Sequence, residues 1–323
     1  YDSLDSDAEI KGIFLESTLV KQASEGQKVL IVLDQTSFYG ESGGQVGDRG
    51  KFASKTAAGN ILDCKKQGKV FIHKAFIKEG KIKTGDIIKM TVEKEKRAAI
   101  AIHHSSTHLA HAALREVLGD HVQQKGSLVD ENKLRFDFSH DKPLTKDQIS
   151  AIEAIVNKEA LNNSEVKTEL MRLDDALKSG AMALFGEKYD DDVRVLTMGD
   201  NSYSVELCGG THVKRTGDIG FFIIINQSSV ASGIRRIEAV AGMKAIDHIE
   251  KIRQINLSLQ TSLNVSSEDM LEKVQNLIEE NKELKKNKNK TVKKSTVFSE
   301  TFEIDDFKLV VEQVKIDNPK ELR

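Results

Sequence analysis

The amino-acid sequence predicts an α+β fold with a small β-barrel at its start and a helical arm near its end. Three observations lead to this prediction. Strand-length apolar runs alternate with glycines up to about residue 93, apolar residues change to helical spacing near Lys94, and a heptad-like pattern begins at Met270. We therefore divide the chain into a β-barrel-like part (1–93), an α+β domain (94–242), a helical linker or coiled coil (243–296) and the start of a further domain (297–323).

The composition is that of a globular protein with two or three domains. The 323 residues are 39% hydrophobic and 30% charged, and no apolar run approaches the ~18 residues of a membrane-spanning helix. A net charge of −2 provides no global attraction for nucleic acid, so such binding would have to come from local patches. Two cysteines, Cys64 and Cys208, cannot form a disulfide framework, and we expect a reducing, cytoplasmic setting. Because the chain begins at Tyr1 without a leader and ends directly after an apolar run, we expect it to be a piece of a longer protein.

The first part of the sequence consists of short strand-like runs. A β-branched apolar run at 28–33 has strand length, and further strand-like runs lie at 70–73 and 87–92. Five glycines fall within eleven residues between Gly40 and Gly50, and regular short strands with turn signals are typical of a small barrel. Gly43 and Gly44 admit two interpretations, a close approach of backbone to a ligand or a tight turn at a barrel corner. The cluster lacks a P-loop lysine and a dinucleotide-binding pattern, which argues against the binding and hydrolysis of nucleoside triphosphates.

The second part mixes helices and strands. Apolar residues at helical spacing predict a helix from about Lys94 to Leu118, ended by Gly119, and a second helix from 146 to 161 after Thr145. Strand-like runs lie at 133–138, 193–196 and 221–225. This mixture is typical of an α+β domain.

The residues from Met243 to about Lys294 have the pattern of two helices. In the second helix the steps of 4, 3, 4 and 3 residues form a short heptad seam through Met270, Val274, Leu277, Asn281 and Leu284. Two arrangements stay open, a helical hairpin packed on its own chain and a coiled coil. The apolar run at 307–311 is interpreted as the first strand of a further domain.

A group of histidines and one cysteine predicts a metal site. His104 and His108 lie one helical turn apart, and Cys208 and His212 repeat the same three-residue gap. Imidazole nitrogens and a thiolate are ligands that zinc prefers, so we predict a zinc site formed by these four residues. The alternative is a buried cysteine with ordinary surface histidines. His111 lies three residues after His108, and spacing alone leaves open whether it is a ligand.

These motifs stand in a longer ordered set that resembles the alanyl-tRNA synthetase family over essentially the whole chain. The motifs that carry the resemblance are residues 34–39, 42–48, 104–118, 124–128, 206–213 and 233–239. The resemblance implies the proofreading part of such an enzyme, its helical linker and the start of its C-terminal domain. The aminoacylation domain, which uses ATP and Mg²⁺, would precede residue 1.

The resemblance also implies roles for individual residues. Such a proofreading part hydrolyses Ser-tRNA(Ala) and Gly-tRNA(Ala) at a zinc-containing site. Thr36 is then a candidate to contact the serine hydroxyl, Gln124 to form a second polar wall, and Gly43 and Gly44 to lie against the substrate. The alternatives are a turn hydroxyl for Thr36, and for Gln124 a cap on the helix that ends at Gly119 or contact with water.

The partner implied by the resemblance is tRNA(Ala). Arg235 and Arg236, together with Lys214 and Arg215 beside the zinc motif, form the candidate patch for tRNA phosphates. The alternative for these cations is ion pairing with Glu238 or Asp218. No membrane partner is expected, and a homodimer formed through a C-terminal region outside this chain stays open.

Three other functions compete with this one. A freestanding alanyl-tRNA editing hydrolase would share the zinc motifs, but such proteins do not generally continue past residue 239 into a long helical arm. A zinc-structured tRNA-binding module would have no hydrolytic activity of its own. A metalloprotease is disfavoured because Ser105 stands where the general-base glutamate of His-Glu-x-x-His is required.

Overall fold

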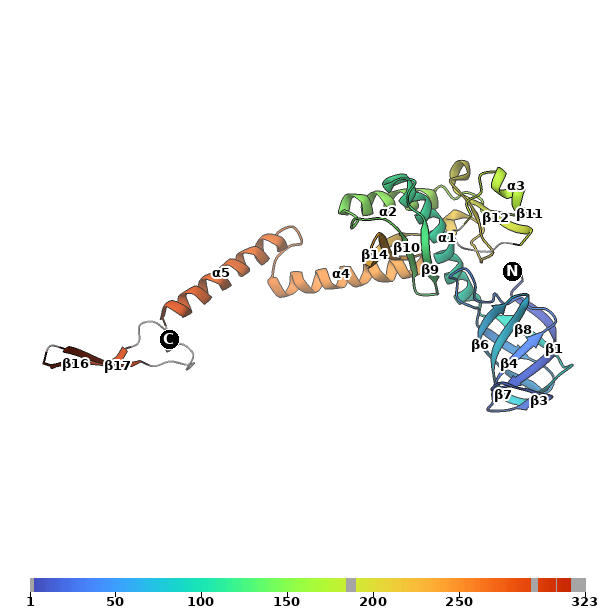
Figure 1. Cartoon of the computed structure of the whole chain (residues 1–323), viewed down its shortest axis with the longest axis horizontal. Helices are drawn as coiled ribbons and strands as arrows, with labels where there is room; N and C mark the ends of the chain where they lie inside the picture. The colour runs from blue at the N-terminus through green and yellow to red at the C-terminus, as the bar shows by residue number, and fades with distance from the viewer. Residues whose placement is uncertain (1–2, 184–189, 292–295, 306, 315–323) are drawn as a thin grey trace. The chain divides into compact units, whose positions relative to one another are not determined.

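The computed structural model describes residues 3–183, 190–291, 296–305 and 307–314. The chain divides into two compact units, residues 1–248 and 249–323 (Figure 1). The first unit contains every residue of the candidate site.

The first eight strands build the predicted β-barrel. They are β1 (Asp5–Leu15), β2 (Thr18–Val20), β3 (Gln22–Ser24), β4 (Lys28–Leu33), β5 (Gly50–Ala53), β6 (Ala57–Gln67), β7 (Val70–Lys83) and β8 (Ile87–Val92). Six of them close a ring in the order β1-β4-β7-β6-β5-β8, and β8 pairs antiparallel with β1. The barrel predicted from the glycine-punctuated strands is therefore confirmed.

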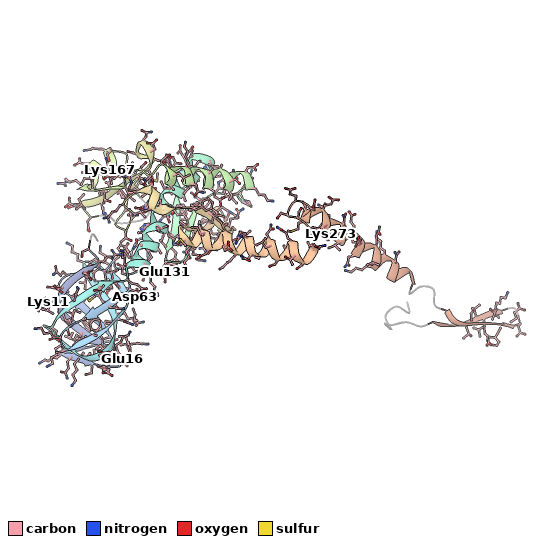
Figure 2. All side chains as sticks on the ribbon, turned by 180° about the vertical axis from the view of Figure 1, so that it is seen from behind. Lys11, Glu16, Asp63, Glu131, Lys167 and Lys273 are labelled. Atoms are coloured by element: carbon pink, nitrogen blue, oxygen red, sulfur yellow. The ribbon has the colours of Figure 1, made fainter. Side chains whose placement is uncertain are left out.

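Alternation of apolar and polar residues places the barrel core. Along β8 the side chains of Ile88, Met90 and Val92 are buried while those between them are exposed, which is the period of two expected for a strand with one face inward. The charged side chain of Lys11 in β1 is exposed on the outer face, and that of Glu16 is exposed in the turn after β1 (Figure 2).

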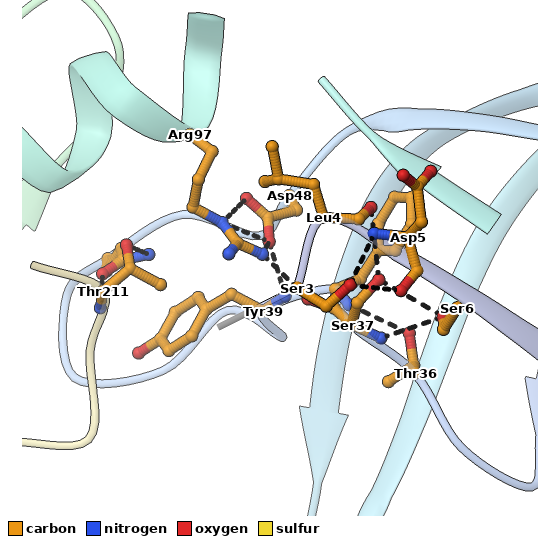
Figure 3. Close-up of polar contacts among 12 residues, drawn as sticks. Ser3, Leu4, Asp5, Ser6, Thr36, Ser37, Tyr39, Asp48, Arg97 and Thr211 are labelled. Atoms are coloured by element: carbon orange, nitrogen blue, oxygen red, sulfur yellow. Dashed lines mark hydrogen bonds and ion pairs between the residues drawn. The ribbon is translucent and has the colours of Figure 1, made fainter. Parts of the chain in front are cut away.

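A buried ion pair connects the barrel to the long helix α1 (Lys94–Leu118). Arg97 Nε lies 2.9 and 3.0 Å from the two carboxylate oxygens of Asp48, and Arg97 Nη2 also contacts that carboxylate (Figure 3). Arg97 Nη2 donates in addition to the carbonyl oxygen of Ser37 at 2.9 Å, and the backbone N–H of Tyr39 donates to Asp48 at 2.6 Å. Because these bonds join the 37–48 loop to the first turn of α1, they fix where the loop meets the helix.

A four-stranded antiparallel sheet packs with α1 and with α2 (Lys146–Leu161) around the second core. Its order is β14-β15-β10-β9, formed by β14 (Phe222–Ala231), β15 (Ile234–Ala241), β10 (Leu134–Ser139) and β9 (Gln124–Val129). Leu109 and Leu114 of α1, Phe136 and Phe138 of β10 and Ile152 of α2 are fully buried there. The predicted start of α2 is also observed, since the Thr145 and Gln148 side chains form a reciprocal capping box.

A smaller sheet precedes the cysteine motif. It has the order β11-β12-β13, with β11 (Lys167–Arg172), β12 (Asp192–Met198) and β13 (Ser204–Leu207), and the short helix α3 (Leu173–Lys178) packs on it. Two short 3-10 helices, η1 (Asp200–Ser202) and η2 (Thr216–Ile219), complete this part. Because β13 ends at Leu207, the strand delivers Cys208 directly to the site.

The last part of the chain contains two helices and a hairpin. The helices are α4 (Met243–Leu263) and α5 (Met270–Thr291), at the positions that the sequence predicts, and their packing as a hairpin or coiled coil stays a prediction, as do the domain boundaries. The interpretation of 307–311 as a first strand was wrong, because β16 (Thr296–Ile304) precedes and pairs antiparallel with β17 (Phe307–Val314). Asp305, whose φ is 52°, lies in the short connection that lets the two strands pair. None of the helices in the described residues is long and apolar enough to span a membrane.

Candidate metal centre

Two pairs of side chains converge in the first unit to form a candidate metal centre. His104 and His108 project from one face of α1, and Cys208 and His212 come from the loop that follows β13. Their four candidate ligand atoms all lie within 4.8 Å of one another. The Cys208 sulfur is 3.5 Å from His104 Nε2 and 3.3 Å from His212 Nε2. The structure thus brings together the four residues that the sequence predicts as ligands.

In each of the three histidines, Nδ1 is hydrogen-bonded to an oxygen atom of a residue outside this group of four. The partners of the Nδ1 atoms are Gln45 Oε1 at 2.6 Å for His104, Glu206 Oε2 at 2.8 Å for His108 and Ser105 Oγ at 3.2 Å for His212. Amide and carboxylate oxygens only accept hydrogen bonds, so the protons of His104 and His108 belong on Nδ1. Their Nε2 lone pairs then face the centre, which is the arrangement that metal-binding histidines require.

Gln45 is itself held in one orientation. The backbone N–H of Thr211 donates to Gln45 Oε1 at 2.9 Å, and Gln45 Nε2 donates to Thr211 Oγ1 at 2.9 Å. Gln45 is completely buried. Since the amide cannot rotate without losing both bonds, its oxygen stays directed at His104.

One atom at the centre lacks a partner. His108 Nε2 is buried and has no hydrogen-bond partner among the described residues. Buried polar atoms are nearly always satisfied, and an unsatisfied one costs about 1–3 kcal/mol. A divalent metal ion held by three imidazoles and a thiolate would satisfy His108, and this donor set fits zinc.

The charge on Cys208 also suits a metal ligand. Burial by itself raises the pKa of the thiol, but the neighbouring imidazoles of His104, His108 and His212 outweigh burial and hold this pKa well below its ordinary value. The backbone N–H of Gly210 donates to the sulfur at 3.4 Å. The sulfur is therefore prepared to act as a thiolate.

His111 supports the centre and is not among the four converging residues. Its Nδ1 lies 3.2 Å from Glu206 Oε1, so one buried carboxylate holds both His108 and His111. The ring of His111 packs against Phe136 with 5.1 Å between centroids. The structure thus places His111 behind Glu206 and outside the group of four, with its Nε2 buried and without a hydrogen-bond partner among the described residues.

Sequence reasoning did not assign roles to Gln45, Glu206 and Ser105. Glu206 precedes Cys208 by two residues and Ser105 follows His104 directly, so both lie inside the metal motifs. Gln45 is 59 residues from His104, and only its place in the glycine-rich run points to it. A polar residue inside a metal motif is the signal that could have identified Glu206 and Ser105, and no such signal marks Gln45.

A small pocket of about 110 Å³ lies beside the centre. Gly43 and Gln124 line it, as do Lys66 and Ser127, together with His104, His108 and Cys208. Gly44 lies next to this lining and presses against β9, since a Cβ atom there would stand 2.6 Å from the carbonyl oxygen of Ser127.

Thr36 is not among the residues that line the pocket. Its hydroxyl lies 2.9 Å from Nε2 of the buried His73 and accepts the backbone N–H of Phe38 at 3.1 Å. The local backbone contact that the sequence offered as an alternative for Thr36 is therefore present.

The four cations predicted to contact tRNA have different surroundings. Arg236 forms two bonds to Asp137, of 2.6 and 2.8 Å, and Arg215 bonds Asn163. Lys214 is exposed, and Arg235 Nε is buried with no hydrogen-bond partner among the described residues. Their role as phosphate contacts stays a prediction.

Comparisons with known proteins identify the family. Residues 1–96 match the family model of class II (A) tRNA synthetases, and residues 193–238 match that of the threonyl and alanyl tRNA synthetase second additional domain. Over 320 residues the chain is 47% identical to the alanine–tRNA ligase of Prochlorococcus marinus subsp. pastoris, covering 97% of this chain and 36% of the relative. The chain belongs to the alanine–tRNA ligase family.

Other members of this family give the same result. The alanine–tRNA ligase of Saccharophagus degradans is 45% identical over 329 residues, which is 100% of this chain and 38% of the relative. That of Sinorhizobium medicae is 44% identical over 303 residues, covering 91% and 34%. The chain therefore spans little more than a third of the length of these alanine–tRNA ligases. The second additional domain match includes Glu206, Cys208 and His212, whereas the class II match includes Gln45.

Proposed function

We propose that this chain is the proofreading part of an alanine–tRNA ligase and hydrolyses Ser-tRNA(Ala) and Gly-tRNA(Ala). We infer that the whole enzyme joins alanine to tRNA, as the names of the relatives suggest, and that it uses ATP and tRNA(Ala), as the family resemblance implies. The observation that carries the proposal is the four-residue metal centre on the wall of a small pocket, in a chain of this family.

The chemistry of alanine selection explains the need for such a site. A pocket for alanine cannot strongly exclude glycine, which is smaller, or serine, which adds one hydroxyl. A methylene-sized difference in an apolar pocket is worth only about 1–3 kcal/mol. A second, hydrolytic site can remove the wrong products after they form.

The size and polarity of the pocket support a small aminoacyl group. Its volume of about 110 Å³ is well below the ~300–1,000 Å³ of ordinary ligand pockets. We propose that Gln124 and the Ser127 hydroxyl bind the hydroxyl of serine, because alanine would leave these polar groups without a partner. Thr36 could bind the serine hydroxyl only if its own hydroxyl gave up the hydrogen bond to His73. Removal of glycine then rests on pocket size and not on hydroxyl recognition.

We propose that His104, His108, Cys208 and His212 bind zinc. When bound, zinc would supply an electrophilic centre that can orient the aminoacyl ester or lower the pKa of water. Gln45 and Glu206 keep the protons of His104 and His108 on Nδ1, so that both rings present Nε2. Lys66 lines the same pocket and supplies a positive charge for the developing negative charge on the ester carbonyl oxygen.

A second function is favoured by one observation. Four protein ligands form a closed coordination sphere, which is typical of structural zinc sites. This favours a zinc-structured module that binds tRNA and does not hydrolyse it.

Deacylation of charged tRNA tests the proposal. The chain should hydrolyse Ser-tRNA(Ala) and Gly-tRNA(Ala) and spare Ala-tRNA(Ala), and Cys208→Ala should abolish this hydrolysis. Cys64→Ala is the matched control, because Cys64 is the other cysteine and is buried in the barrel core. No hydrolysis by a folded, zinc-loaded chain that binds tRNA would overturn the hydrolase and favour the binding module.

A further inference from the structure

Two imidazoles form a flat pair where β9 begins and β10 ends. His121 and His140 are joined by a hydrogen bond of 2.9 Å between His121 Nε2 and His140 Nδ1. Their planes differ by 27° and their centroids are 5.2 Å apart. A bond between ring edges at this small angle places the rings nearly side by side, so together they present one broad flat surface. His121 is exposed and His140 is half-buried.

Contacts within the strand ends hold this pair in place. The ring of Phe138 lies at 29° to that of His140, with 6.4 Å between centroids. The Ser139 hydroxyl donates to the backbone carbonyl of His121 at 2.7 Å and accepts the backbone N–H of Gln123 at 2.9 Å. The flat surface is therefore preformed.

The strand register relates the pair to the pocket. Gln124, which lines the pocket, pairs with Phe138, and His140 follows Phe138 by two residues. His121 precedes Gln124 by three residues, at most about 10 Å at ~3.3 Å per residue. His121 thus lies no farther from Gln124 than the rise of about three stacked nucleotides at ~3.4 Å each.

A cation stands beside the pair. Arg235 of β15 pairs with Phe138 in the β10–β15 register, and its Nε is buried without a hydrogen-bond partner among the described residues. Burial first, and then the charge of His121, lower the pKa of His140. Arg235 and Lys142 act in the same direction, and Asp141 opposes them. Aromatic surface beside cationic groups is what single-stranded nucleic acid binds.

We propose that the His121–His140 pair is a stacking surface for an unpaired nucleobase near the 3′ end of the tRNA, and that Arg235 binds a neighbouring phosphate. The proposal rests on the proposed function, since it assigns the binding of the RNA end whose ester enters the pocket. Stacking of one base changes affinity about 5- to 150-fold. Stacking contacts the base and not the attached amino acid. The surface would therefore hold the 3′ end whatever amino acid this end carries.

Binding of uncharged RNA to the 323-residue chain tests the stacking surface. The probes are an RNA hairpin with the acceptor-stem sequence and an unpaired 3′ end, and the same hairpin with a blunt end, followed by fluorescence anisotropy. His121→Ala should weaken binding of the first hairpin at least 5-fold and leave the second unchanged. His121→Phe should restore binding, because phenylalanine keeps a flat ring and loses the ring nitrogens. Ser139→Ala removes contacts at the strand ends but keeps both rings, and controls for a structural role.

The outcomes separate this inference from the proposed function. Equal binding of both hairpins by the unaltered chain would overturn the stacking surface, and so would a His121→Phe variant as weak as His121→Ala. Hydrolysis of Ser-tRNA(Ala) is measured in parallel, where His121→Ala should raise KM at least 5-fold with little change in kcat. If the unaltered chain does not hydrolyse Ser-tRNA(Ala) but prefers the unpaired end through His121, the proposed function fails and the stacking surface stands.

Discussion

A methyl group added at Gly210 should damage the metal centre. A Cβ atom at this position would lie 2.0 Å from His104 Cε1 and 2.4 Å from His104 Nδ1. The optimal separation of such atoms is ~3.5 Å, so the ring must move by roughly 1.5 Å. Coordination distances tolerate only about 0.2 Å. The movement would also break the 2.6 Å bond between His104 and Gln45.

The neighbouring glycine provides the control. A Cβ atom at Gly209 meets no atom within 4 Å, so Gly209→Ala carries the same backbone change without the collision. We expect Gly210→Ala to lower zinc affinity by ~100-fold or more, beyond the ~10–100-fold typical of a lost supporting hydrogen bond. Gly209→Ala should bind zinc as the unaltered chain does. Competition with a chromophoric chelator measures both, and equal affinities in the two variants would refute the argument that His104 is fixed.

Three further predictions, tested with four variants, concern the surroundings of the site and the barrel. Glu206→Gln should lower zinc affinity by ~10–100-fold in the same competition assay, because a carboxylate that holds two histidines is lost; unchanged affinity would contradict this. Asp48→Asn should cost about 3–5 kcal/mol in urea unfolding, since it leaves Arg97 as a poorly compensated buried charge, and Asp48→Asn combined with Arg97→Met should recover part of this loss. Burial lowers the pKa of His73 from 6.5 to about 4, partly opposed by a backbone hydrogen bond. Protonation therefore favours the unfolded chain, and stability should fall by up to about 3 kcal/mol as the pH drops from 6.5 to 4. His73→Gln should flatten this part of the stability profile, and an unchanged slope would contradict the assignment.

Local patterns made much of the architecture predictable. The strands at 28–33 and 87–92 and the helices at 94–118 and 146–161 were expected at these positions, because period-two or helical spacing and caps are encoded within each segment. The hairpin strand at 296–304 was missed, since a weakly apolar run after a lysine-rich helix gives little signal. Its antiparallel pairing with β17, the next strand along the chain, reveals it.

In the candidate site, too, some residues could be predicted from local patterns and others could not. The four converging residues were expected because two of them lie within one helical turn and two within one loop. Gln45 and its bond to His104 were not, because the approach of the loop to α1 depends on the distant ion pair between Asp48 and Arg97. The place of His111 behind Glu206 likewise depends on which way α1 is turned against β13.

The Asp48–Arg97 ion pair limits how this protein can be divided. Judged by its strands and helices, the chain could be cut between the barrel and α1, after residue 93. A chain starting at Lys94 would keep all four candidate ligands yet lose Gln45, the acceptor that sets the His104 tautomer, and would expose the Arg97 guanidinium. Recombination or gene fission at that junction would separate the ligands from the group that orients them. A gene that encodes a working metal centre of this kind must therefore also encode the barrel part that contains Gln45.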